Sequence, residues 1–259
     1  MYLDRDTFVH RLDPRTKIIA TVLFFVLALI FNDPRYLALV AGGLLILGVG
    51  SQSLENFWRM RVILVLLFVF SSIFWPFFAR GPTVIWTWGP LVLTRESLLY
   101  GIAMGFRLSS MLMAGLVFLS TTKIEEFTGG LIRLRIPYPM AFAFSTSLRL
   151  VPTFAGAGAT IVQAQISRGL DLESGGLAAR FRRFIPLAVP LFIYAIRHTN
   201  LLAMALESKG FSPEHKRTFY LELKMGLWDY VILFFLIALI IVLLILRLRG
   251  YGVVMPGRI

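Results

Sequence analysis

The sequence predicts an all-α integral membrane protein with about five transmembrane helices and a cytoplasmic domain of long crossing helices. Hydrophobic residues make up 58% of its 259 residues, charged residues make up 15%, and the mean hydropathy is +0.78. These values lie well outside the usual range of soluble proteins. Long apolar stretches recur along the chain, and a basic segment separates the last of them from the others.

Five stretches are apolar enough to be predicted as membrane spans, which need about 20 residues. They run over residues 17–31, 36–50, 62–78, 98–119 and 228–246. Only Asn32-Asp33-Pro34-Arg35 separates the first two, and this turn chemistry predicts a tight helical hairpin. In the last span, Trp228 and Tyr230 precede an unbroken apolar run, as expected where a helix enters the interface.

Lys and Arg residues predict the orientation, because they are enriched in short cytoplasmic loops. The residues before the first and third spans are basic, which places both ends in the cytoplasm; they are Arg5, Arg11, Arg15, Lys17, Arg59 and Arg61. The loop from Arg80 to Glu96 then lies outside. Residues 123–217 contain twelve Lys and Arg against six Asp and Glu, a net charge of +6, and are predicted to be cytoplasmic.

One group of basic residues departs from this rule. Five spans put Arg247, Arg249 and Arg258 outside, where Lys and Arg are usually depleted. A dip of residues 186–206 into the membrane is the alternative, and it leaves the side of the C-terminus open.

We therefore divide the chain into three parts. Residues 1–122 form a membrane domain with four transmembrane helices, residues 123–222 a cytoplasmic domain, and residues 223–259 a C-terminal transmembrane helix and tail. Within the cytoplasmic domain, one helix of about 28 residues, roughly 42 Å long, is predicted between Pro139 and Gly169. Polar residues are spread along it and would be costly to bury in lipid, so we expect it to lie under the bilayer.

A second long helix is predicted over residues 186–209, apolar up to Ile196 and polar from Arg197. In the first helix, the small-residue run over residues 155–159 predicts a close helix crossing. The two helices are therefore expected to cross one another.

Both long helices end in the same pattern, Ser167-Arg168-Gly169 and Ser208-Lys209-Gly210. Glycine readily adopts the left-handed conformation after the last turn, and a cation there complements the helix dipole. One copy is therefore ordinary for a helix end. Two copies, each after an apolar helix that contains proline, favour a surface that engages another protein.

Composition and motifs exclude several other functions. The net charge of +12 favours anionic lipid or acidic protein surfaces as partners, because no module for binding nucleic acid is recognisable. The chain lacks cysteine, so we expect neither a disulfide framework nor a thiolate metal site. It also lacks a phosphate-binding loop, so we expect no ATPase activity of that type. His10, His198 and His215 are too scattered to predict a metal site. The pair Glu125-Glu126 is typical of the first turn of a helix.

Four segments together carry a family resemblance. They are HRLDPRTK at residues 10–17, LRLVPT at 148–153, QAQISRG at 163–169 and LAMALESKGF at 202–211. In this order they resemble the T component of energy-coupling factor (ECF) transporters, and the likeness covers nearly the whole chain.

The resemblance implies a non-catalytic membrane scaffold in the plasma membrane of a prokaryote. It would join a substrate-binding membrane subunit (the S component) to two cytoplasmic ATP-binding-cassette (ABC) ATPases for uptake of a vitamin or a transition-metal ion. ATP and magnesium would be bound by the ATPases, and no cofactor or metal by this chain. Residues 123–222 would be the coupling domain.

In that family the long coupling helices end in Ala-Arg-Gly motifs that dock on the ATPases. The resemblance carries this role to Ser167, Arg168 and Gly169, and to Ser208, Lys209 and Gly210. Serine replaces alanine in both motifs and lysine replaces arginine in the second, which puts the strength of that docking contact in doubt.

Two other functions stay open from the residues alone. A conventional permease subunit with its own pore would need polar residues inside the spans, for which Arg107 is the best candidate. A membrane protein of regulatory or assembly function would use its basic face on anionic lipid.

For the scaffold, we also expect an adaptable surface for substrate subunits at small or flexible side chains, namely Met104, Gly105, Met111, Met113, Ala141 and Ala143.

Overall fold

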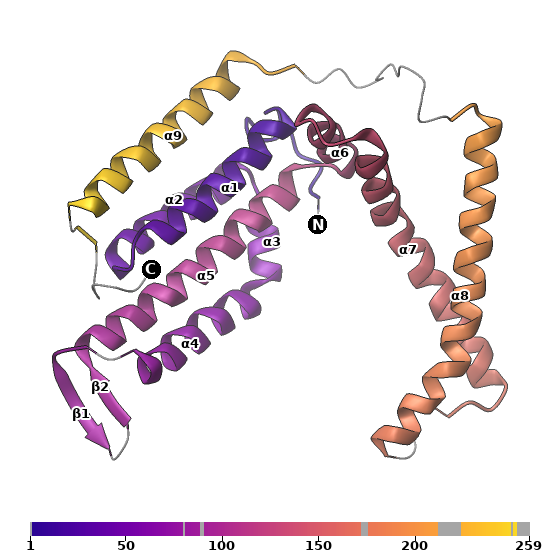
Figure 1. Cartoon of the computed structure of the whole chain (residues 1–259), viewed down its shortest axis with the longest axis horizontal. Helices are drawn as coiled ribbons and strands as arrows, with labels where there is room; N and C mark the ends of the chain where they lie inside the picture. The colour runs from indigo at the N-terminus through magenta and orange to yellow at the C-terminus, as the bar shows by residue number, and fades with distance from the viewer. Residues whose placement is uncertain are drawn as a thin grey trace. The chain divides into compact units, whose positions relative to one another are not determined.

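Helices form nearly all of the regular structure in the computed structural model of the chain (Figure 1). It describes residues 2–79, 81–88, 91–171, 176–211, 224–249 and 251–252. The chain divides into two compact units: a membrane unit, Met1–Leu134 with Glu222–Ile259, and a crossed-helix unit, Arg135–Leu221. The first predicted domain boundary, after residue 122, differs from the unit boundary after Leu134. The second, after residue 222, lies outside the described residues.

The membrane unit contains most of the elements. They are α1 Pro14–Ile30, α2 Pro34–Gly50, α3 Leu54–Arg59, α4 Arg61–Phe78, β1 Val84–Trp88, β2 Leu91–Thr94, α5 Arg95–Thr121, α6 Ile124–Arg133 and α9 Leu227–Leu248. The crossed-helix unit consists of α7 Tyr138–Ser167 and α8 Leu177–Ser208.

The prediction of an all-helical membrane protein is confirmed. Within the described residues, four helical segments are long and apolar enough to cross a membrane: Arg61–Phe78, Arg95–Thr121, Arg182–Ser208 and Leu227–Leu248. Three of them coincide with predicted spans. The other two predicted spans form α1 and α2, which have only 17 residues each. The remaining segment lies in α8, where the sequence left open a dip into the membrane.

Aspartate followed by proline begins both helices of the first hairpin. The carboxylates of Asp13 and Asp33 accept hydrogen bonds from the backbone N–H groups of Arg15 and Arg35, both at 2.9 Å. Proline fits the first helical position, because its missing N–H would have no partner there. The predicted turn between these helices is confirmed, since α1 ends at Ile30 and α2 begins at Pro34.

Helix α5 is the central element and packs against α1, α2 and α4 (Figure 1). Against α4 it presents Gly101 and Gly105, one turn apart. A Cβ at Gly101 would lie 2.8 Å from the carbonyl oxygen of Ser72, and one at Gly105 would lie 2.9 Å from that of Phe68. Only glycine permits this approach of two backbones.

This packing corrects part of the expected surface for substrate subunits. Gly105 and Met104 are buried within the membrane unit, and Ala141 is 1% exposed. These three residues contribute to ordinary helix packing, and their placement in an adaptable outer surface was wrong.

Arg107 lies buried in α5 and binds the end of α1. Its Nε donates to the carbonyl oxygen of Ala28 at 2.9 Å, and its Nη2 donates to that of Phe31 at 2.7 Å and to Oδ1 of Asn32 at 2.6 Å. From α9, Arg247 donates to the carbonyl oxygens of Leu29 and Ile30. The last carbonyl groups of α1, which have no partner within the helix, thus obtain charged donors.

The opposite end of α1 holds a second buried cation. Lys17 is 5% exposed, and its Nζ donates to the carbonyl oxygens of His10 and Thr121, both at 2.8 Å. Glu126, in the first turn of α6 as predicted, lies 3.9 Å from the same Nζ. Lys17 therefore joins the N-terminal segment, the end of α5 and the start of α6.

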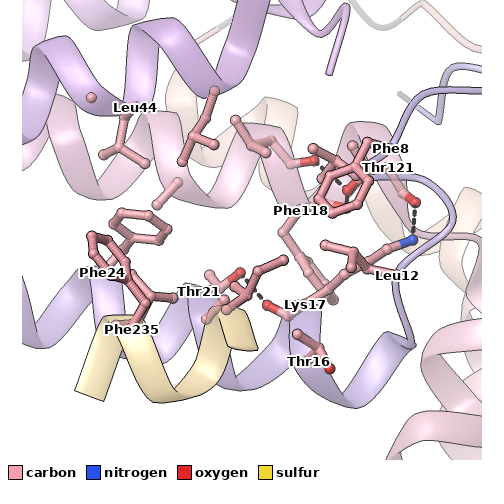
Figure 2. A pocket seen from close by; sticks show the side chains of 18 of the residues that line it. Phe8, Leu12, Thr16, Lys17, Thr21, Phe24, Leu44, Phe118, Thr121 and Phe235 are labelled. Atoms are coloured by element: carbon pink, nitrogen blue, oxygen red, sulfur yellow. Dashed lines mark hydrogen bonds between the residues drawn. The ribbon is translucent and has the colours of Figure 1, made fainter. Parts of the chain in front are cut away.

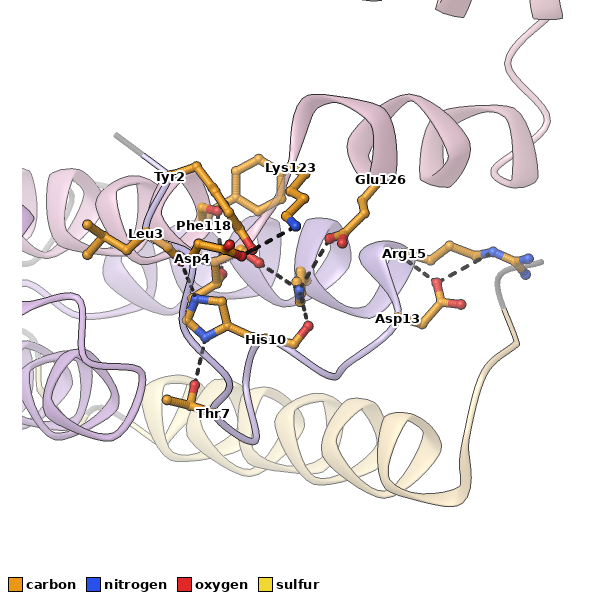
Figure 3. Close-up of polar contacts among 12 residues, drawn as sticks. Tyr2, Leu3, Asp4, Thr7, His10, Asp13, Arg15, Phe118, Lys123 and Glu126 are labelled. Carbon is orange, nitrogen blue, oxygen red and sulfur yellow. Dashed lines mark hydrogen bonds and ion pairs between the residues drawn. The ribbon is translucent and has the colours of Figure 1, made fainter. Parts of the chain in front are cut away.

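His10 folds the N-terminal segment onto this end of the unit. Its ring nitrogens contact Oγ1 of Thr7 at 2.7 Å and the carbonyl oxygen of Leu3 at 3.1 Å (Figure 3). Partial burial lowers the pKa of His10, which favours the neutral ring that donates one of these hydrogen bonds and accepts the other.

The loop after α4 contains a two-stranded hairpin that the sequence did not predict. Strands β1 and β2 pair antiparallel, with Val84 opposite Thr94 and Trp86 opposite Leu93. Thr94 then begins α5, because its hydroxyl accepts from the backbone N–H of Ser97. The connecting residues 89 and 90 lie outside the described part of the chain.

Replacing Arg107 tests its role at the end of α1. We expect Arg107→Met to destabilise the membrane unit by about 2–3 kcal/mol, because buried carbonyl groups lose charged donors without gaining others. Arg107→Lys should recover only part of the loss, since one ammonium cannot reach the same acceptors as a guanidinium fork. Thermal unfolding in detergent measures the effect, with Arg35→Met, at an exposed site, as control. Equal stability of Arg107→Met and Arg35→Met would contradict this role.

Candidate docking ends of the crossed helices

The predicted crossing of two long helices is present in α7 and α8, which form an antiparallel pair (Figure 1). At the crossing, the ring of Phe154 in α7 meets Tyr194 and His198 of α8, with centroid distances of 6.0 and 5.8 Å. Near the start of α7, Phe142 packs on Phe211, the third residue after α8, at 4.7 Å. The end of α8 therefore lies beside the start of α7.

The crossing does not use the small-residue run that predicted it. A Cβ added at Gly156 or Gly158 would have no atom within 4 Å, so no described neighbour packs closely there. The predicted close approach at these glycines was wrong. Aromatic side chains hold the helices together instead, because flat rings fill the wider space between them.

An antiparallel crossed pair separates the two sequence motifs. The first motif follows α7, and the second follows α8 beside the start of α7. Helix α7 has 30 residues, so its two ends are about 45 Å apart. The motifs thus occupy opposite ends of the antiparallel pair.

The end of α7 is capped by backbone groups alone. Gly169 has a φ of +88°, its N–H donates to the carbonyl oxygen of Ile166 at 2.9 Å, and Leu170 N–H donates to that of Gln165 at 3.0 Å. This pair of hydrogen bonds defines a Schellman motif, which requires the left-handed conformation that glycine adopts without strain. The hydroxyl of Ser167 donates back to the carbonyl oxygen of Gln163 at 3.1 Å.

The end of α8 repeats this geometry. Gly210 has a φ of +72°, its N–H donates to the carbonyl oxygen of Glu207 at 2.8 Å, and Phe211 N–H donates to that of Leu206 at 2.9 Å. The hydroxyl of Ser208 donates to the carbonyl oxygen of Ala205 at 3.0 Å. The sequence analysis missed Leu170 and Phe211, although an apolar residue directly after the glycine is the usual signal for this cap.

The side chains of Arg168 and Lys209 take no part in these caps. Both are exposed, and both side chains lack an ion pair or hydrogen bond within the described residues. The predicted site residues thus form two equivalent helix ends, in each of which serine and glycine complete the backbone and the cation points into solvent.

The other polar residues considered from the sequence do not form a second site. His10 binds the N-terminal segment, His198 packs at the helix crossing, and His215 lies outside the described residues. The described ranges hold no group of three or more histidine, aspartate or glutamate side chains placed to bind a metal ion.

Comparison with known proteins identifies relatives along most of the chain. The family described as "Cobalt transport protein" (CbiQ) matches residues 5–221. The energy-coupling factor transporter transmembrane protein EcfT of Staphylococcus aureus (strain 04-02981) is 31% identical over 258 residues, covering 96% of each chain.

Two further relatives carry the same name. EcfT of Thermanaerovibrio acidaminovorans is 35% identical over 242 residues, covering 90% of this chain and 89% of its own. EcfT of Thermosediminibacter oceani is 34% identical over 233 residues, covering 86% and 88%. Because the family match includes both long helices and the relatives align over nearly their full lengths, the chain belongs to the CbiQ/EcfT family of energy-coupling factor transporter transmembrane proteins.

Proposed function

We propose that the protein is the non-catalytic coupling subunit of an ECF-type importer. It joins two cytoplasmic ABC ATPases, which bind ATP and magnesium, to a substrate-binding S component in the plasma membrane of a prokaryote. The cargo is a vitamin or a transition-metal ion, in keeping with the family description as a cobalt transport protein. In this proposal the crossed-helix unit is cytoplasmic.

The observation that carries the proposal is the pair of exposed cations beyond backbone-capped helix ends. A cation that served only to cap a helix would lie against the last carbonyl groups. In α7 and α8 the N–H groups of residues 169, 170, 210 and 211 already bind those carbonyls. Arg168 and Lys209 are therefore available to acidic groups on a partner.

The spacing of the motifs supports a pair of ATPases as that partner. Two ends about 45 Å apart, on one antiparallel helix pair, suit two separate subunits of similar shape. ATP binding closes the ATPases, their grooves move the two helix ends, and the crossed pair tilts as one body. That tilt reorients the bound S component.

The contacts of Arg107 do not support a pore through the membrane unit. This residue was the best candidate for a polar pore lining, but three of its hydrogen bonds go to the end of α1 and the adjoining turn. Its side chain is buried at 6% exposure and acts within the protein.

Charge reversal at each motif tests the docking assignment. The planar guanidinium of Arg168 can bind a carboxylate through two parallel hydrogen bonds, whereas Lys209 supplies a single flexible ammonium. Loss of one partner from such an interfacial pair costs on the order of 2–5 kcal/mol. We expect Arg168→Glu to reduce ATPase retention and transport more than Lys209→Glu, and the double variant to release the ATPases. Pull-down of the ATPases in matched detergent and salt measures retention.

Matched controls separate docking from general charge effects. Arg149→Glu and Arg197→Glu reverse exposed charges in the middle of α7 and α8 and should retain the ATPases. Gly169→Ala keeps the cation but strains the left-handed cap by about 1–2 kcal/mol. If the double variant of Arg168 and Lys209 held the ATPases as well as wild type, the docking assignment would be wrong.

The proposed role also predicts where ATP hydrolysis occurs. The purified chain alone should hydrolyse no ATP, because its sequence has no phosphate-binding loop, and activity should appear only when the ATPases are added. A phosphate-release assay on the chain, before and after a second chromatographic step, measures this. Turnover that co-elutes with the isolated chain would count against a non-catalytic subunit.

A further inference from the structure

A cavity of about 650 Å³ lies within the membrane unit, between α1, α2, α5, α9 and the N-terminal segment (Figure 2). Most of its lining side chains are aliphatic or aromatic. Phe8, Lys17 and Thr121 lie at one end in Figure 2, and Phe24 and Phe235 lie at the other. The volume falls in the usual range for binding pockets, which is roughly 300–1,000 Å³.

Most polar groups at the first end are hydrogen-bonded within the protein, and the exception among the lining residues is the buried hydroxyl of Thr16. Lys17 Nζ donates to the carbonyl oxygens of His10 and Thr121. The hydroxyls of Thr21 and Thr121 donate to the carbonyl oxygens of Lys17 and Val117, at 2.8 and 2.9 Å. Because these three groups are already hydrogen-bonded and most of the lining is apolar, a hydrocarbon matches the cavity better than a polar ligand.

The cavity is elongated along the membrane helices. On α9 it runs from Trp228 to Leu239, about 16 Å at the helical rise. A tryptophan is typical of the membrane interface, and one leaflet contributes about 15 Å to the hydrocarbon core. The cavity thus has the length of one leaflet and begins where a lipid headgroup would lie.

We propose that this cavity binds one acyl chain of a membrane phospholipid from the leaflet that lies at the Trp228 end of α9. The acyl chain fills the space between α2 and α9. Helix α2 packs mainly on α5, and α9 packs on α1. The site lies entirely within the membrane unit, and its occupation does not depend on the proposed coupling role.

Continuity with the bilayer identifies the occupant as lipid. The lining helix α9 is long and apolar enough to span the membrane, and its outward side chains such as Phe234 are 76% exposed. Lipid chains therefore contact the outward face of this helix, and an apolar opening beside it is accessible to them without passage through water.

Two neighbouring glycines of α2 provide a matched test. A Cβ at Gly42 or at Gly43 would have no atom within 4 Å, so either position accepts a larger side chain. Only Gly43 lines the cavity. Gly43→Phe should fill the cavity, whereas Gly42→Phe adds the same side chain to the same helix outside it.

The experiment uses the full chain in nanodiscs of phosphatidylglycerol and phosphatidylethanolamine, with a small fraction of phospholipid that carries a photoreactive diazirine in one acyl chain. After irradiation, mass spectrometry compares labelling of the cavity residues Ile232 and Leu236 with that of Phe234. We expect Gly43→Phe to reduce labelling of the two cavity residues several-fold and to leave Phe234 unchanged. In wild type and in Gly42→Phe, both the two cavity residues and Phe234 should be labelled.

Three results would overturn the inference. The first is equal labelling of the cavity residues in Gly43→Phe and wild type. The second is absence of cavity labelling in wild type while Phe234 is labelled. The third is loss of cavity labelling when the wild-type chain is assembled with its partner membrane subunit, which would identify a protein helix as the occupant.

Discussion

Carbonyl groups at the ends of membrane helices need donors that lipid cannot supply, and this constraint organises the membrane unit. Arg107 and Arg247 meet it at the end of α1, and Lys17 meets it at Thr121, the last residue of α5. Each cation comes from a different element than the carbonyl it binds. The same hydrogen bonds therefore cap the helices and hold them against one another. They also give Arg247 a structural role at a position where the five-span prediction does not expect a basic residue.

The crossed-helix unit meets the same requirement differently. Glycine at positions 169 and 210 turns the chain so that following backbone N–H groups bind the last carbonyls. This solution depends on a conformation that other residues adopt only with strain. Because the backbone completes the caps, the neighbouring cations carry no structural duty. The same residue type thus stabilises the fold in one unit and is available to a partner in the other.

Hydrophobic run length and helix-end chemistry were sufficient to predict much of this structure. The turn at residues 32–35 and the glycine caps at Gly169 and Gly210 follow from local rules. The Asp13 cap was not predicted, and the crossing was predicted from a small-residue run that does not form it. The hairpin of β1 and β2 was missed, because its short apolar strands resemble a loop rich in proline and glycine. Roles that depend on tertiary contacts were also missed: Gly105 and Met104 are buried by α4 and α5, and the crossing uses Phe154 rather than Gly156.

The N-terminal end of α1 is where both connections to the crossed-helix unit are attached. The polypeptide enters the crossed-helix unit after α6 and leaves it before α9. Both helices are fastened at the same end of α1: Glu126 lies 3.9 Å from Lys17, and Asp229 accepts the backbone N–H of Asp13 at 3.0 Å. The helix before the crossed-helix unit and the helix after it are therefore bound to the same end of α1. Arg107 and Arg247 bind its other end, so α1 is held by tertiary hydrogen bonds at both of its ends.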